Sequence, residues 1–168
     1  METLGEYTLV DVDISNIEEV LKIYSSNEEY FILSGGSPAT IDNIHKDMKE
    51  TLPNTRDEQK HYKAIKLDKE YIGVIDYIVE YPNFDSIYIG LFIIEKCFQG
   101  CGHGNKIMQN FEMKLKEKSF RKIQLGVLHN NESAFKFWNR IGFKTIKEIN
   151  STIHPEKNWV IKVMEKEI

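Results

Sequence analysis

Residues 99–105 have the composition of a phosphate-binding turn. Three glycines stand at alternate positions in this segment, and an uncharged apolar run over residues 87–94 precedes it as a predicted strand. Apolar side chains then recur at helical spacing between residues 107 and 115. Glycines let the backbone turn tightly, so that N–H groups can converge at the positive end of the following helix. A strand, a glycine turn and a helix in this order predict an anion site suited to phosphate.

Two common phosphate motifs do not fit this turn. A P-loop that starts at Gly100 requires glycine at position 105 and a hydroxyl residue at 107, where the chain has Asn105 and Ile107. A dinucleotide fingerprint that starts at Gly100 or Gly102 requires its third glycine at 105 or 107, and neither position has one. A structural turn without a ligand is the simplest alternative.

The pattern that does fit is Gln-x-x-Gly-x-Gly, formed by Gln99, Gly102 and Gly104. It resembles the acetyl-CoA pyrophosphate loop of the GNAT acetyltransferase superfamily. A second match follows downstream and looks like the second GNAT motif, in the expected order: Leu125-x-Val127-x-x-x-Asn131-x-x-Ala134-x-x-x-Trp138-x-x-x-Gly142-Phe143. Because two motifs at suitable spacing are far more specific than one, the chain is identified as a member of this superfamily, in a subgroup without an assigned substrate.

The resemblance implies an enzyme that moves an acetyl group from acetyl-CoA directly to a primary amine, which we expect to belong to a small molecule. The alternatives are a peptide or protein amine as acceptor, or a non-catalytic acyl-CoA-binding or sensory module. Many relatives have Arg or Lys where this chain has Asn105, so we expect the adjacent Lys106 to supply that charge. The residues that the resemblance assigns to the cofactor are Phe92, Ile93, Ile94, Gln99, Gly100, Cys101, Gly102, His103, Gly104, Asn105, Lys106, Asn131 and Trp138.

The acceptor amine must lose a proton before it can attack. With a pKa of ~10.4, only about one alkylammonium in 2,500 is neutral at pH 7, which corresponds to roughly 4.6 kcal/mol. A carboxylate is the natural proton acceptor. Asp76 is a candidate because apolar residues surround it in a predicted strand, where an unpaired carboxylate would be costly. The alternatives are that Asp76 faces solvent or pairs with a lysine on a neighbouring strand.

The departing thiolate needs a proton, and the resemblance does not supply the residue that donates it. Many relatives place a tyrosine where this chain has Trp138, whose indole N–H cannot deliver that proton. The thiolate then leaves unassisted, takes a proton from water, or uses another hydroxyl such as that of Tyr88. Tyr88 can equally be a core aromatic. His129, at the end of a predicted strand, is a further candidate base. The spacing of the histidines and of Cys97 and Cys101 indicates no metal site.

Hydrophobic periodicity predicts the elements that position these residues. We expect helices that begin after Ser15, in a capping box with Glu18, and after Thr40. Two more helices are expected over 106–115 and 132–140, and strands are expected at 7–12, 62–67, 71–80, 87–94, 122–128, 143–149 and 159–165. The fold class is α/β of the α+β type: the GNAT fold, a mixed, mostly antiparallel sheet of about six to seven strands with helices on both faces.

The composition is that of an ordinary globular protein and limits the domain number, the partners and the location that we expect. The chain has 168 residues, 41% hydrophobic and 29% charged, and we expect one domain over residues 1–168. The net charge of −4 argues against nucleic acid as a partner. No membrane span or signal segment is expected, which favours a cytoplasmic location. The resemblance also allows a homodimer, since dimers are common in the superfamily.

Overall fold

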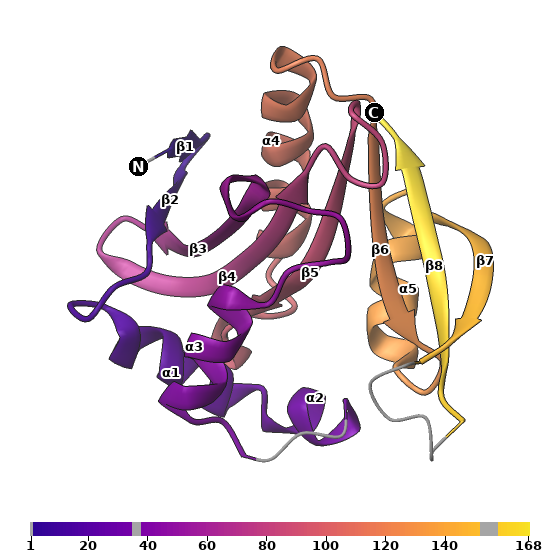
Figure 1. Cartoon of the computed structure of the whole chain (residues 1–168). Coiled ribbons are helices and arrows are strands. Elements are labelled where there is room, and N and C mark those ends of the chain that lie inside the picture. The colour runs from indigo at the N-terminus through magenta and orange to yellow at the C-terminus, as the bar shows by residue number, and fades with distance from the viewer. Residues whose placement is uncertain (1, 35–37, 152–157) are drawn as a thin grey trace.

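The computed structural model describes residues 2–34, 38–151 and 158–168. Its strands form one sheet in the order β1-β2-β3-β4-β5-β6-β8-β7 (Figure 1). The strands are β1 (Glu2–Leu4), β2 (Tyr7–Asp11), β3 (Lys60–Leu67), β4 (Glu70–Val79), β5 (Ser86–Ile94), β6 (Lys122–Leu128), β7 (Lys144–Asn150) and β8 (Val160–Glu167). The helices are α1 (Ile17–Ser26), α2 (Glu28–Leu33), α3 (Ile41–Lys49), α4 (His103–Glu117) and α5 (Glu132–Arg140), with short 3-10 turns η1 (Asp57–Gln59) and η2 (Lys96–Phe98).

The sheet is mixed and mostly antiparallel, as expected. Among the described strands, only β5 and β6 pair in parallel, because the α4 crossover joins them. The expected number of strands was too small: the described sheet has eight strands rather than six or seven. The additional strand is β1, which forms a hairpin with β2 at the sheet edge.

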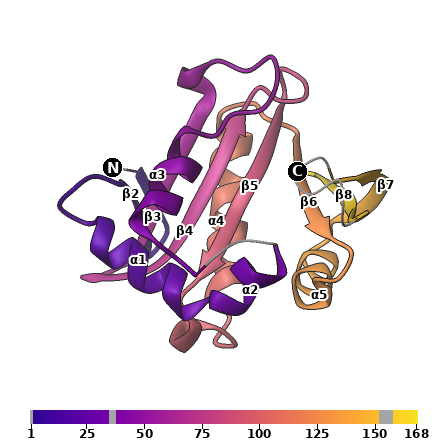
Figure 2. The ribbon, with the colours of Figure 1, turned by 60° about the horizontal axis from the view of Figure 1, so that its bottom comes forward.

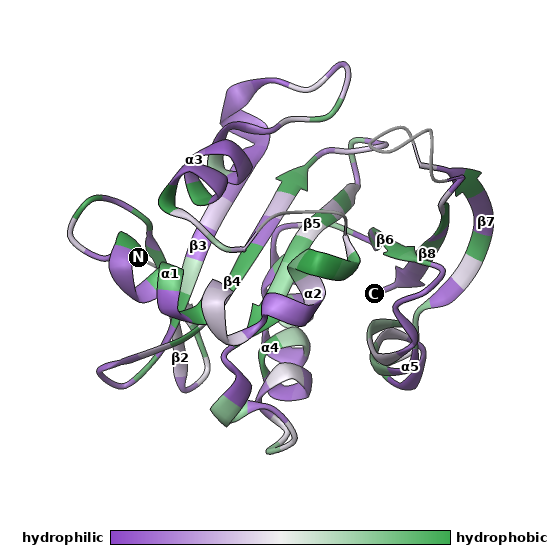
Figure 3. Ribbon diagram, turned by 90° about the horizontal axis from the view of Figure 1, so that it is seen from below, coloured by the Kyte–Doolittle hydropathy of each residue, from purple (hydrophilic) through white to green (hydrophobic). Residues whose placement is uncertain are grey.

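Helices cover both faces of the sheet (Figure 2). α1 and α3 pack on one face over a core that includes Ile23 and Ile44. α4 and α5 pack on the other face over a larger core that includes Phe111 and Trp138. Figure 3 shows that hydrophobic segments are concentrated on β4 and β5, which lie between these layers. The sheet therefore separates an α1–α3 side from an α4–α5 side.

The two expected helix caps had different outcomes. Thr40 caps α3 as predicted, since its hydroxyl accepts a hydrogen bond from the N–H of Asn43 in a capping box. The capping box of Ser15 with Glu18 is wrong. The Ser15 hydroxyl donates to Asp13 Oδ1 at 2.6 Å, and α1 begins one residue later, after Asn16. The Ser15 N–H donates to the same oxygen at 2.7 Å, so Asp13 holds Ser15 in a local turn ahead of the helix instead of at its N-cap.

A helix that periodicity did not predict, α2, follows α1 almost directly. Asn27 ends α1 and begins α2, and Tyr30 lies within α2. Six residues are too few to show a helical repeat in sequence. Among the residues that the structure describes, no helix combines the length and apolar character that a membrane crossing requires.

Candidate active site

β5 and β6 are paired at one end only, and this separation creates the groove of the site. Their register joins Ser86–Ile89 with Lys122–Leu125, and beyond these residues β6 pairs only with β8. Figures 1 and 2 show the two strands diverging. A cavity of about 130 Å3 lies where they separate. Its lining combines the open edges of both strands with α2 and α5: Tyr30, Ile89, Gly90, Leu91, Phe92, Leu125, Gly126, Val127, Leu128, Asn131, Ala134 and Trp138.

The alternation of backbone groups along β5 decides which of them face the groove. Glu95 N–H donates to Ile72 O at 2.8 Å on the β4 side, so Ile93 also directs its backbone groups toward β4. Phe92 and Ile94 direct theirs to the open side. The Ile94 carbonyl already accepts two side-chain amides, at 2.7 and 3.0 Å. The groups left for a ligand are those of Phe92 and the N–H of Ile94.

The glycine turn leads directly into α4 and leaves its donors unpaired. Gly100 and Gly102 have φ of 78° and 87°, left-handed values that favour glycine, and a Cβ on either would meet no heavy atom within 4 Å. Across the described residues, the N–H groups of residues 100–105 have no intramolecular hydrogen-bond acceptor. Unpaired donors at a helix N-terminus beside open space are suited to a pyrophosphate.

The larger side chains of this turn are engaged away from that space. The His103 Nδ1 and Tyr7 hydroxyl are hydrogen-bonded at 2.9 Å, and burial raises the pKa of Tyr7 to about 12. Lys106 pairs with Glu6 at 3.2 Å, although both groups are about half exposed. The exposed Cys101 and the partly buried Asn105 complete the loop. The side chains of His103 and Lys106 thus connect the start of α4 to Tyr7 of β2 and to Glu6 in the β1–β2 turn.

Aromatic packing connects the turn with the second motif. A Cβ on Gly104 would lie 3.3 Å from the Phe137 ring, so α4 can approach α5 only because position 104 has no side chain. Trp138 is 6% exposed and contacts the rings of Phe92, Phe137 and Phe143. Trp138 therefore forms part of both the core and the cavity wall.

Asn131 lies in the groove and caps α5. Its Oδ1 accepts a hydrogen bond from Ala134 N–H at 3.1 Å, and the residue lines the cavity. Asn131 thus has a structural role as the N-cap of α5. The geometry leaves its amide N–H2 available to a ligand.

Asp76 lies behind a β-bulge at the centre of the groove. The register of β4 with β5 shifts at this point, which leaves Gly90 as the extra residue. A Cβ on Gly90 would be 2.8 Å from Asp76 Oδ2, so the carboxylate occupies the place of the missing side chain. Gly90 itself is exposed and lines the cavity. The Asp76 carboxylate therefore lies against the backbone of a residue that lines the groove.

The Asp76 carboxylate is buried and half-paired. Lys60 Nζ donates to its Oδ2 at 2.8 Å, while Oδ1 is sealed from solvent and has no partner in the described chain. Burial raises the pKa of Asp76 to about 6, and the Lys60 ammonium opposes that shift. The expected alternative, a lysine on a neighbouring strand, is therefore the arrangement found. It still leaves Asp76 with a pKa close to neutrality.

A chain of hydroxyls that sequence reasoning missed lies beside this strand on the α1–α3 side. Tyr62 is opposite Asp76 in the sheet register, and its hydroxyl is 2.7 Å from that of Tyr24, which donates to Asp47 at 2.8 Å. Burial raises the pKa of Asp47 and of both tyrosines. The signal for this cluster was weak because its members come from α1, α3 and β3.

Tyr88 and His129 occupy different surroundings. The Tyr88 hydroxyl is 3.1 Å from where a Cβ on Gly126 would lie, so it sits between β5 and β6 beside the cavity. Burial raises the pKa of Tyr88, and the hydroxyl stays protonated at neutral pH. His129 is exposed, its Nδ1 is 3.3 Å from the N–H of Val160, and it is not part of the cavity lining. The described residues contain no group of three or more His, Cys, Asp or Glu arranged to hold a metal ion.

The sequence profile of the Acetyltransferase (GNAT) family matches residues 19–143. This is most of the chain, and the chain belongs to that family. Its members use acetyl-CoA as the acetyl donor, and the open glycine loop and the free edge of β5 fit that co-substrate. No curated protein sequence matches the chain at a significant level.

Solved structures show the same fold at low sequence identity. An acetyltransferase from Thermus thermophilus is 20% identical with a TM-score of 0.78, over 98% of this chain and 99% of that one. A PaiA N-acetyltransferase from Thermoplasma acidophilum, solved with coenzyme A, is 14% identical with a TM-score of 0.66, over 96% and 99%. A chimeric spermidine N-acetyltransferase from Vibrio cholerae is 14% identical with a TM-score of 0.68, over 97% and 96%.

Proposed function

We propose that this GNAT acetyltransferase acetylates a primary amine of a small molecule, with Asp76 as the proton acceptor. The observation that carries the proposal is the position of the Asp76 carboxylate directly behind Gly90 of the groove. A carboxylate with a pKa of about 6 is ionised at pH 7 to 8 and attracts an ammonium group. Its pKa is also near the pH at which a general base works best.

The acceptor end of the groove is narrow. Tyr30 of α2 lines the cavity, and burial raises the pKa of Tyr30 to about 12, with the charges of Asp47 and Asp76 contributing. The neutral Tyr30 hydroxyl therefore lies near two carboxylates. A compact, aromatic-walled space with negative charge behind it favours a small cationic amine over a polypeptide chain.

Each step of the reaction can be assigned to groups of this chain. Acetyl-CoA supplies the activated thioester. The N–H groups of residues 100–105 hold its pyrophosphate, and the backbone of Phe92 with the N–H of Ile94 orients its arm. Asp76 takes the ammonium proton through water at the Gly90 bulge, and Tyr88 gives a proton to the departing sulfur. His129 stays a prediction, since its exposed ring is held at Val160.

A thermal-shift measurement with acetyl-CoA tests whether the glycine loop binds this co-substrate, with Gly102→Asp as the control. The added carboxylate would face the phosphates, so the stabilisation by acetyl-CoA should disappear in this variant while the unliganded protein still unfolds cooperatively. A wild type that shows no shift at millimolar acetyl-CoA would overturn the assignment of the loop.

A panel of acceptor amines tests the proposed substrate class, with release of the CoA thiol as the readout. Small mono- and diamines should release CoA faster than peptides with a free N-terminus. Faster turnover of the peptides would reassign the acceptor class, and binding without any turnover would favour a non-catalytic acyl-CoA-binding module.

A further inference from the structure

Asn27 is both the C-cap of α1 and the N-cap of α2. Its N–H donates to Tyr24 O at the end of α1, and its carbonyl accepts from Tyr30 N–H in the first turn of α2, each at 2.9 Å. Its side-chain Nδ2 also donates to Ile23 O at 2.9 Å, which satisfies one of the unpaired carbonyls at the end of α1. Any movement of Asn27 therefore moves α2, which carries Tyr30.

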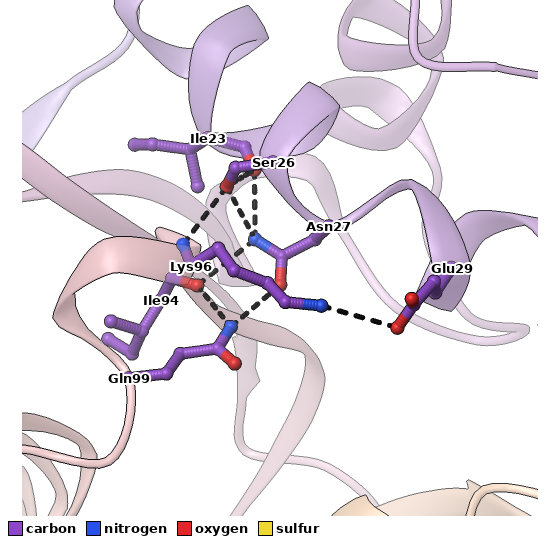
Figure 4. A network of polar contacts seen from close by, with 7 residues as sticks. All are labelled: Ile23, Ser26, Asn27, Glu29, Ile94, Lys96 and Gln99. Carbon is purple, nitrogen blue, oxygen red and sulfur yellow. Dashed lines mark hydrogen bonds and ion pairs between the residues drawn. The ribbon is translucent and has the colours of Figure 1, made fainter.

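The same side chain reaches across to β5 and to the start of the glycine loop. Asn27 Nδ2 lies 3.0 Å from Ile94 O, and Asn27 Oδ1 accepts from Gln99 Nε2 at 2.8 Å. Gln99 Nε2 donates its other hydrogen to the same Ile94 carbonyl at 2.7 Å. Figure 4 shows this closed triangle of two amides and one carbonyl, which we call the amide clamp.

Two further contacts run between the same segments (Figure 4). Lys96 N–H donates to Ser26 Oγ at 3.1 Å, and Lys96 Nζ pairs with Glu29 at 3.3 Å. The ion pair is exposed on both sides and contributes little. The amide clamp is different because Gln99 directly precedes Gly100, so it fixes the residue from which the unpaired N–H groups begin.

We propose that Asn27 is a positioning residue for the pyrophosphate loop, which it holds through Gln99 and the Ile94 carbonyl. The inference rests on the proposed cofactor role of residues 100–105. A phosphate site made of backbone donors requires those donors to be fixed before the ligand arrives, since ordering a loose loop would consume binding free energy. The Gln99 side chain thus serves the cofactor by holding the loop, through its bonds to Asn27 and to the Ile94 carbonyl.

The inference also connects the two substrates. Asn27 joins the loop that holds the donor to the helix that carries Tyr30 of the acceptor wall. Acetyl-CoA that fixes the loop would therefore fix α2 through the amide clamp. This predicts that acetyl-CoA tightens the packing of α2 and that the effect requires Asn27.

The test is the dissociation constant of acetyl-CoA, measured by calorimetry well below the melting temperature of each variant. Asn27→Ala and Gln99→Leu should each weaken binding roughly ten-fold, since each removes the hydrogen bond between the two amides and a hydrogen bond to the Ile94 carbonyl. The double variant should be little weaker than either single variant, because both changes open the same clamp. Glu28→Ala, an exposed neighbour on α2, is the matched control and should bind like wild type.

The outcomes separate this inference from the proposed function. Wild type that does not bind acetyl-CoA would overturn the proposed cofactor role. Wild type that binds, with Asn27→Ala and Gln99→Leu binding equally well, would overturn the clamp alone, even if both variants melt at lower temperature. Fully additive losses in the double variant would also overturn it, because the two residues would then act separately.

Discussion

The ammonium of Lys60 lies 2.8 Å from Asp76 Oδ2, and the two side chains are only 7% and 10% exposed. Desolvation opposes the ionised carboxylate more strongly than this cation favours it, since the pKa of Asp76 still rises to about 6. The pair therefore fixes the carboxylate that we propose as the base, while its pKa stays near neutrality.

The pH dependence of the rate should report this carboxylate. If Asp76 is the base, kcat/KM falls below pH about 6 as one proton is taken up. Lys60→Met removes the cation that lowers this pKa, so the midpoint of the acid limb should move to higher pH. Initial rates between pH 5 and 9, with the amine well below its KM and acetyl-CoA saturating, measure kcat/KM for the amine. A midpoint that stays in place in Lys60→Met would assign the limb to another group.

Stability should respond to pH in the direction that a raised pKa dictates. The pKa of folded Asp76, about 6, exceeds its ordinary value of 3.8, so the folded state binds the proton more tightly than the unfolded state. The stability associated with that proton is complete below pH 3.8 and is lost as pH rises through about 6. Urea unfolding at pH 4 and pH 7 should show wild type losing free energy relative to Asp76→Asn. An equal change in both proteins would contradict the raised pKa.

A methyl group at the bulge should disable the base. A Cβ on Gly90 would lie 2.8 Å from Asp76 Oδ2, so Gly90→Ala must displace the carboxylate or the strand. We expect kcat/KM to fall roughly 100-fold, the scale of a misplaced catalytic group. Adding Asp76→Asn to this variant should cost little more. If the two losses multiply, the Gly90 effect does not act through Asp76.

Tyr88→Phe should slow the chemical step without weakening binding. Loss of a general acid typically costs 10²-fold or more, so we expect a decrease of about that size in kcat with little change in KM for acetyl-CoA. Tyr81→Phe is the matched control and should retain wild-type kcat, since the Tyr81 ring lies edge-on to Tyr88 with 5.9 Å between the ring centroids. Unchanged kcat in Tyr88→Phe would leave water or unassisted departure as the source of the proton.

Trp138 should matter mainly for packing. It is almost fully buried against three aromatic rings, so Trp138→Ala should lower the free energy of unfolding by about 3–5 kcal/mol. Trp138→Tyr restores the residue that many relatives have there, yet Tyr88 already provides a hydroxyl beside the cavity. We therefore expect no increase in kcat for Trp138→Tyr, and an increase would show that the acid position is vacant in wild type. Denaturant unfolding and initial rates measure the two effects.

Long periodic elements could be predicted from the sequence, and short ones could not. The bounds of β6 and α5 agree with the expectation, as does the glycine turn between β5 and α4. β1 has three residues and α2 has six, which is too short for a period to be recognised. The Ser15 capping box was wrong because the Ser15 N–H and hydroxyl both donate to Asp13, which holds Ser15 in a turn before α1 begins.

The site divides in a similar way. Motif residues such as Gly102 and Asn131 could be placed because their roles depend on local backbone. Lys60 could not, since it lies outside the strand expected at 62–67. Its reach to Asp76 depends on the β3–β4 register, in which Lys60 is opposite Ile78 and diagonal to Asp76. Asn27 likewise acts on a residue 72 positions away in the chain. Such partners become visible only when the sheet register and helix packing are known.

The one-ended pairing of β5 with β6 also has a consequence for the order of folding. Strands β1 to β5 lie side by side in chain order, with the helices α1 to α3 inserted between β2 and β3. Strands β6, β8 and β7 form a separate antiparallel unit. Four residue pairs, formed only after the whole α4 crossover, join the two units. Such long-range contacts form late. We expect the groove to be the last part of the molecule to assemble, so that amide exchange at Ile87 and Ile89 increases first when denaturant is added.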